Sequence, residues 1–126
     1  MTFVTEMKRQ TRYNIITIKR KEVMILSVLA VNKQNFESVV KSEKPVLLDF
    51  YADWCGPCRM VSPLVDEIAE ENPQYLVGKI NVDNEPELAA AFSVSSIPML
   101  VAMKDGKVVN YAVGARGKAQ ILEMLK

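Results

Sequence analysis

Two cysteines, Cys55 and Cys58, are the residues of this chain whose type and spacing point most directly to chemistry. They are the only cysteines among 126 residues, and the sequence contains no histidine. A pair with this spacing can form a structural disulfide, supply part of a metal site, or exchange with disulfides of other molecules. The surrounding residues decide between these three functions.

The two structural alternatives are weak. The stabilisation from a disulfide grows with the length of the loop that it closes, and this pair closes almost none. A structural zinc site needs four ligands, usually Cys or His, so this chain could form one only by sharing ligands with a second chain. A c-type haem site requires His directly after the second cysteine, where this sequence has Arg59. We therefore expect no bound metal and no bound cofactor.

A redox dithiol fits the local sequence better. The pair follows an apolar run, residues 45–52, that is typical of a strand buried on both faces. It precedes a helix that should begin near Pro57, a residue suited to a first helical turn. Helix N-termini stabilise the thiolate, which is the nucleophilic form of cysteine. We expect Cys55 to be the better exposed and to attack, and Cys58 to resolve the mixed disulfide. Gly56 would permit close approach of a partner backbone.

The elements around the pair alternate between strand and helix and end in a hairpin and a helix, in the order βαβαβαββα. Asp105-Gly106 is a strong hairpin signal. Pro63 should kink the helix that follows the cysteines. The pattern predicts an α/β fold with a mixed sheet of about five strands flanked by four helices. The expected strands are 24–30, 45–52, 75–83 and the two halves of 98–114, and the expected helices are 32–41, about 57–68, 86–92 and one at the end of the chain.

Composition predicts one soluble domain, with 49% hydrophobic and 25% charged residues. The net charge of +1 predicts no nucleic-acid partner. Residues 1–23 carry six basic and two acidic side chains, a net charge of +4, whereas the remainder carries 10 basic and 13 acidic ones, a net charge of −3. We therefore predict a domain over 24–126 and a basic N-terminal extension over 1–23. The extension is a tail, an extra strand or the product of a wrongly assigned start, since Met24 could begin the protein.

The longest apolar run, residues 23–31, is too short to span a membrane. We interpret it as a buried first strand and expect a cytoplasmic protein. A signal segment, and hence export, is the alternative.

From residue 24 to the end, the chain resembles the thioredoxin family. The resemblance rests on "WCGPC" (54–58), "LLDF" ending at Phe50, Pro63, "KINVD", "SSIPML", Gly106 and Gly114. It implies the thioredoxin fold and a protein-disulfide reductase that works by dithiol–disulfide exchange in cell redox homeostasis. It also implies a redox-active Cys55–Cys58 disulfide, re-reduction by a thioredoxin reductase that uses NADPH, and a monomer that binds oxidised proteins as extended peptides.

The resemblance also implies roles for particular residues. Cys55 would be the nucleophile and Cys58 the resolving thiol. Asp49 would be a buried carboxylate that accepts the proton of Cys58 through a water, although by itself it could be a strand-end residue that reaches solvent. Lys79 matches a lysine that approaches this aspartate, or else is a solvated edge charge.

An apolar surface for the substrate peptide is implied as well. Its expected residues are Trp54, Gly56, Pro57, Ile97, Pro98 with a cis peptide bond, Val113 and Gly114. Tyr51 and Met99 depart from the family's frequent Trp and Thr. Two rival functions stay open: an exported oxidase or isomerase of the same fold, and a binding module whose dithiol is incidental.

Overall fold

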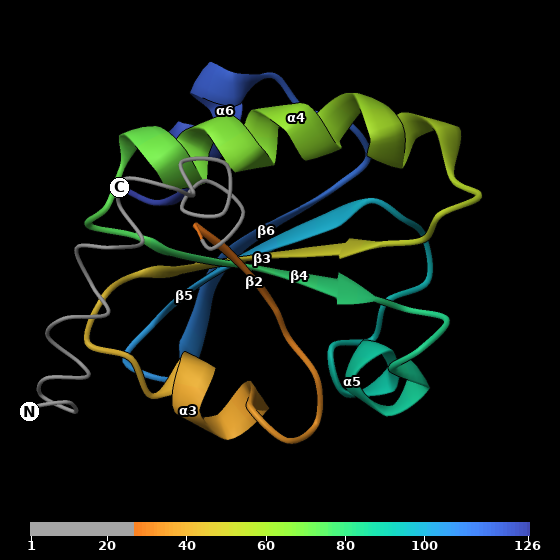
Figure 1. Ribbon diagram of the computed structural model, residues 1–126, viewed down its shortest axis with the longest axis horizontal. Helices are drawn as coiled ribbons and strands as arrows, with labels where there is room; N and C mark the ends of the chain where they lie inside the picture. The colour runs from red at the N-terminus through yellow and green to blue at the C-terminus, as the bar shows by residue number, and fades with distance from the viewer. Residues whose placement is uncertain (1–26) are drawn as a thin grey trace, which may run out of the picture.

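Five strands form one mixed sheet in the computed structural model, which describes residues 27–126 (Figure 1). Their order across the sheet is β2-β4-β3-β5-β6. The elements are β2 (Val28–Ala30), α3 (Phe36–Val40), β3 (Val46–Tyr51), α4 (Gly56–Glu71), β4 (Leu76–Asn81), α5 (Pro86–Ala91), β5 (Met99–Lys104), β6 (Lys107–Val113) and α6 (Lys118–Met124).

The pairing of the strands follows the predicted topology. β2, β4 and β3 run parallel to one another, while β5 is antiparallel to β3 and β6 is antiparallel to β5. Asp105 and Gly106 join β5 to β6 with φ angles of 53° and 77°. Two successive positive φ angles are the signature of the tight hairpin turn that Asp-Gly favours.

Helices cover both faces of the sheet, α4 and α6 on one and α3 and α5 on the other (Figure 1). Successive side chains of β3 therefore enter different cores. Leu48 and Phe50 join the cluster that includes residues of α3 and α5, and Leu47 joins the cluster that includes residues of α4 and α6. Asp49 lies two positions after Leu47 on the strand, so its side chain points to the same face of the sheet, toward α4. It is the one buried charged side chain in the described part of the chain.

The predicted elements within residues 27–126 are confirmed, with bounds shifted by a few residues. α4 runs through Pro63 as a single helix. The predicted extension over 1–23, the boundary at Met24 and the beginning of the predicted first strand lie outside the described residues. Among residues 27–126, no helix is both long and apolar enough to cross a membrane.

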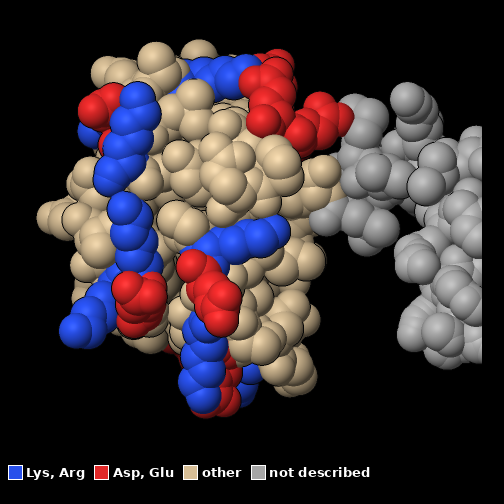
Figure 2. Space-filling view, turned by 90° about the vertical axis from the view of Figure 1, so that its left-hand side faces the viewer, with Lys and Arg blue, Asp and Glu red and all other residues tan. Residues whose placement is uncertain are grey.

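Ion pairs join α6 to the C-terminal part of α4, away from the cysteines. Lys118 Nζ lies 2.7 Å from Glu71 Oε1 and 3.1 Å from Glu67 Oε1. Figure 2 shows this end of the molecule, toward which the C-terminal end of α4 points in Figure 1. Basic and acidic side chains alternate there, so charges of one sign do not gather into a single large area on this face.

Candidate active site

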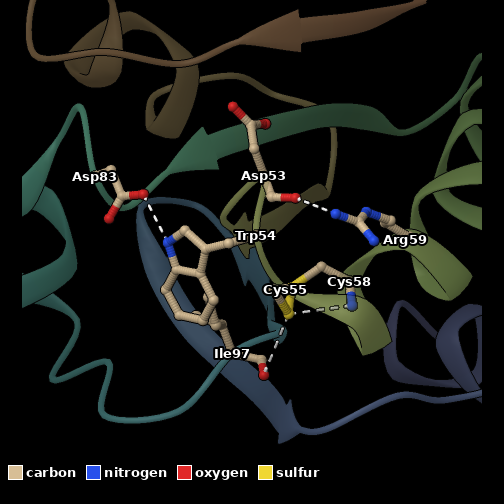
Figure 3. Close-up of a disulfide and its surroundings, with 7 residues drawn as sticks. All are labelled: Asp53, Trp54, Cys55, Cys58, Arg59, Asp83 and Ile97. Atoms are coloured by element: carbon tan, nitrogen blue, oxygen red, sulfur yellow. Dashed lines mark hydrogen bonds between the residues drawn. A yellow bond between two sulfur atoms is a disulfide. The ribbon is translucent and has the colours of Figure 1, made fainter.

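Cys55 and Cys58 form a disulfide at the start of α4 (Figure 3). Their Cα atoms are 5.3 Å apart, within the usual range for disulfides. Cys55 is the N-cap residue of α4, and the Cys58 backbone N–H donates a hydrogen bond to Cys55 Sγ at 3.2 Å. A helix N-terminus with a backbone donor aimed at a sulfur favours negative charge on that sulfur.

In this disulfide form the two cysteines are almost equally buried, with Cys55 only marginally the more exposed. The exposed fractions are 4% for Cys55 and 3% for Cys58. Their surroundings do differ. Cys55 Sγ lies 3.8 Å from the carbonyl oxygen of Ile97, on a separate loop (Figure 3). A Cβ atom added to Gly56 would meet no atom within 4 Å, so the space beside the disulfide is open to another chain.

Two hydrogen bonds hold the loop that precedes the disulfide. Trp54 is 67% exposed, yet its indole Nε1 donates to Asp83 Oδ2 at 2.9 Å. Arg59 Nη2 donates to the backbone carbonyl of Asp53 at 3.0 Å (Figure 3). Neither Asp83 nor Arg59 was predicted to take part. For Asp83 a signal existed, because it follows β4, whose carboxyl end meets that of its parallel neighbour β3 at one edge of the sheet.

The residues predicted to bind substrate lie together around the disulfide. The Ile97–Pro98 peptide bond is cis, and Ile97 packs against the cluster that contains both cysteines. The Gly114 N–H donates to the Pro98 carbonyl at 2.8 Å, which places Val113 and Gly114 beside this loop. Val113 is exposed, as are Gly56 and Pro57 at the beginning of α4. Exposed apolar groups thus surround a reactive bond.

Asp49 is buried on the α4 side of the sheet, with 1% of its surface exposed. Its Oδ1 has no hydrogen-bond partner among the residues that the structure describes. Burial raises the pKa of this carboxyl to about 6, while the positive charge of Lys79 lowers the pKa and the negative charge of Asp66 raises it. A carboxyl group with a pKa near neutrality can both accept and release protons under physiological conditions.

Lys79 lies opposite Asp49 in the parallel register of β3 and β4. Its Nζ donates to Ser62 Oγ and forms an ion pair with Asp66 Oδ1 at 3.1 Å. Both partners belong to α4. The predicted partnership with Asp49 is therefore electrostatic in this structure, and the bonds of the ammonium group go elsewhere. Sequence reasoning missed Ser62 and Asp66, since polar residues on an amphipathic helix are usually read as its solvated face.

The described residues contain no group of three or more His, Cys, Asp or Glu side chains arranged to hold a metal ion.

A family model described as Thioredoxin matches residues 27–126. The chain belongs to the thioredoxin family. It is 53% identical over 88 residues to a thioredoxin of Mycobacterium tuberculosis (strain ATCC 25618 / H37Rv), covering 69% of this chain and 76% of that protein. It is 50% identical over 91 residues to a "Bifunctional thioredoxin reductase/thioredoxin" of Mycobacterium leprae, covering 71% of this chain and 20% of that protein.

Among solved structures, a mutant thioredoxin from Halobacterium salinarum NRC-1 superposes with a TM-score of 0.73. It is 37% identical, and the match covers 78% of this chain and 87% of that one. Fold and family together confirm the prediction of a thioredoxin fold and of a thiol–disulfide oxidoreductase. The protein is a protein-disulfide reductase that acts by dithiol–disulfide exchange through Cys55 and Cys58.

Proposed function

We propose that Cys55 is the attacking nucleophile and Cys58 the resolving thiol. The observation that carries this assignment is the hydrogen bond from the Cys58 N–H to Cys55 Sγ at the N-terminus of α4. In the reduced protein the same donor would face a Cys55 thiolate. Cys58 lies one helical turn further in and has its own sulfur next to Cys55, which suits it to attack that residue in a second step.

The reaction then balances as two exchanges. The Cys55 thiolate attacks one sulfur of a substrate disulfide, forms a mixed disulfide and expels the other substrate sulfur as a thiolate. Cys58 loses its proton and attacks Cys55 Sγ, which releases the second substrate thiol. Two electrons pass to the substrate, and the protein ends with the Cys55–Cys58 disulfide seen in this structure.

Asp49 is proposed as the acceptor of the Cys58 proton, through a water. Its burial and its pKa of about 6 support this role. A carboxylate with this pKa is a stronger base than an ordinary aspartate at the same pH.

The substrate is proposed to be an extended peptide segment of an oxidised protein, lying across the apolar groups beside the disulfide. The exposure of Trp54 and Val113 and the open space at Gly56 support this binding surface. The cis peptide at Ile97–Pro98 lies on the same side and would border the peptide, with Pro57 and Gly114.

The fused relative named "Bifunctional thioredoxin reductase/thioredoxin" supports a separate thioredoxin reductase, using NADPH, as the partner that reduces Cys55–Cys58. We place the protein in the cytoplasm as a monomer. Its domain would span residues 24–126, with residues 1–23 as a basic extension.

An insulin-reduction assay with NADPH and a thioredoxin reductase tests this function. The wild-type protein should turn over, and Cys55→Ser should reduce turnover to background. Turnover by Cys55→Ser would overturn the assignment. The reduction potential of the Cys55–Cys58 pair checks the direction of electron flow, because thioredoxin itself has a potential of about −270 mV and a dedicated oxidant has one of about −120 mV. A value near the latter would contradict reduction as the function.

A further inference from the structure

Ser62, Asp66 and Lys79 form a bonded group that the proposed exchange reaction does not use. Ser62 and Asp66 are four residues apart on α4 and therefore lie on one face of that helix. Both bind the Lys79 ammonium group, Ser62 through Oγ and Asp66 through Oδ1 at 3.1 Å. Lys79 reaches α4 from β4, where its Cα is paired with that of Asp49.

The side chain of Lys79 is long enough for its ammonium group to reach more than one partner. Lysine has a flexible four-carbon stem, so the position of Nζ depends on its bonding partners. Cross-strand neighbours in a sheet place their side chains on the same face, which puts Asp49 within the region that Lys79 can sample. The two bonds to α4 direct the ammonium group elsewhere.

We propose that Ser62 and Asp66 are positioning residues for Asp49, which hold the Lys79 ammonium group on α4 instead of against the buried carboxylate. This inference rests on the proposed role of Asp49 as proton acceptor, and it assigns a purpose to residues outside the dithiol. Ser62 acts by position alone, because it carries no charge. Asp66 acts by position and also by its own negative charge.

The consequence is electrostatic. A cation in direct contact with a carboxylate stabilises the ionised form and lowers its pKa by about 1 to 3 units. Such a carboxylate would be a poorer acceptor for the Cys58 proton. With Lys79 bonded to α4, its charge still lowers the Asp49 pKa from a distance, but burial and Asp66 outweigh it.

Few other groups can compete for control of Asp49. The two charges that act on Asp49 are those of Lys79 on β4 and Asp66 on α4. On β5 the residue opposite Asp49 is Leu100, which is apolar. Lys79 and Asp66 also line a cavity of about 530 Å³ between β2 and α4, so the ion pair borders open space while Asp49 is buried.

A ¹³C NMR titration of the Asp49 side chain in the full-length oxidised protein tests the inference. Ser62→Ala and Asp66→Asn should each move the Asp49 midpoint to lower pH, by about 0.5 to 1 unit. Lys79→Met should move it to higher pH. In a Lys79→Met background, Ser62→Ala should not move the Asp49 midpoint. Asp66→Asn should then produce only the part of its shift that comes from the loss of its own negative charge.

Glu67→Gln is the matched control. It removes one negative charge from the next residue of the same helix, where Glu67 pairs with Lys118 instead of Lys79. The Asp49 midpoint should not move in this variant. An unchanged midpoint in Ser62→Ala would overturn the inference. So would a shift from Asp66→Asn that is equally large with and without Lys79.

The titration involves no substrate, so it separates this inference from the function on which it rests. The proposed role of Asp49 is decided by the pH dependence of the resolving step of Cys58 in the wild type and in Asp49→Asn. If Asp49→Asn leaves that pH dependence unchanged, Asp49 is not the proton acceptor. The titration would still report how Lys79 is held.

Discussion

Replacing Asp49 with Asn should stabilise the folded, oxidised protein near neutral pH. The carboxyl has a pKa of about 6 in the folded protein against an ordinary value of 3.8. A difference of this size corresponds to about 3 kcal/mol at pH values above both. Asn has nearly the shape of the protonated acid and cannot ionise, so the variant avoids this cost. For a domain of this size the gain equals about 10 °C in melting temperature.

The pH dependence of the effect is what ties it to Asp49. At about pH 3 and below the wild-type carboxyl is mostly protonated in both the folded and the unfolded chain, and the two proteins should differ little. Between about pH 4 and 6 the unfolded chain releases the proton while the folded protein retains it, so wild-type stability falls as pH rises. Above the folded pKa the difference should level off near its full value.

Urea denaturation at a series of pH values, followed by far-UV circular dichroism with the disulfide intact, measures this difference. Glu70→Gln, which changes an exposed carboxyl on α4, is the control and should leave the pH dependence of wild-type stability in place. The reasoning is refuted if the Asp49→Asn difference stays constant from pH 4 to 7, or if the variant is the less stable protein at pH 7.

Asp83→Ala removes the acceptor for Trp54 Nε1. Because Trp54 is the only tryptophan, its fluorescence anisotropy should fall, while the free energy of unfolding changes by about 1 kcal/mol or less. Unchanged anisotropy would mean that another contact fixes the indole. Gly78→Ala would place a Cβ 2.5 Å from Val31 Cγ2 and should destabilise the fold by about 1 to 3 kcal/mol in urea denaturation; equal stability would show that the Val31 side chain can move away. Deletion of residues 1–23 should leave the insulin-reduction rate within about twofold of wild type, as expected of residues outside a self-contained domain, and loss of activity would contradict the proposed domain boundary.

Local patterns made much of the fold and the dithiol predictable. The strand before Cys55 is a continuous apolar run, and Pro57 marks the beginning of α4. The Asp105-Gly106 turn identified the antiparallel hairpin from two residues. Each of these signals reflects a backbone preference or a burial pattern that spans only a few positions. The sequence alone is therefore enough to predict it.

The contacts that the sequence did not predict involve side chains from separate elements. Trp54 reaches Asp83 from the loop after β3, and Lys79 reaches Ser62 and Asp66 across the interface between β4 and α4. Such contacts depend on the rotamers of exposed or half-buried side chains, which periodicity does not determine. The nearly equal burial of the two cysteines likewise depends on how the surrounding loops close over them, and not on their order in the chain.

The central claim is that Cys55 attacks the substrate and Cys58 resolves the intermediate. It is tested most directly by incubating Cys58→Ser with an oxidised protein substrate and mapping the product by non-reducing peptide mass spectrometry. We expect a stable mixed disulfide in which Cys55 is joined to a substrate cysteine, and no such adduct on Cys58 in the matched Cys55→Ser variant. Normal turnover by Cys58→Ser, or an adduct that forms on Cys58 when Cys55 is absent as readily as on Cys55, would contradict the account.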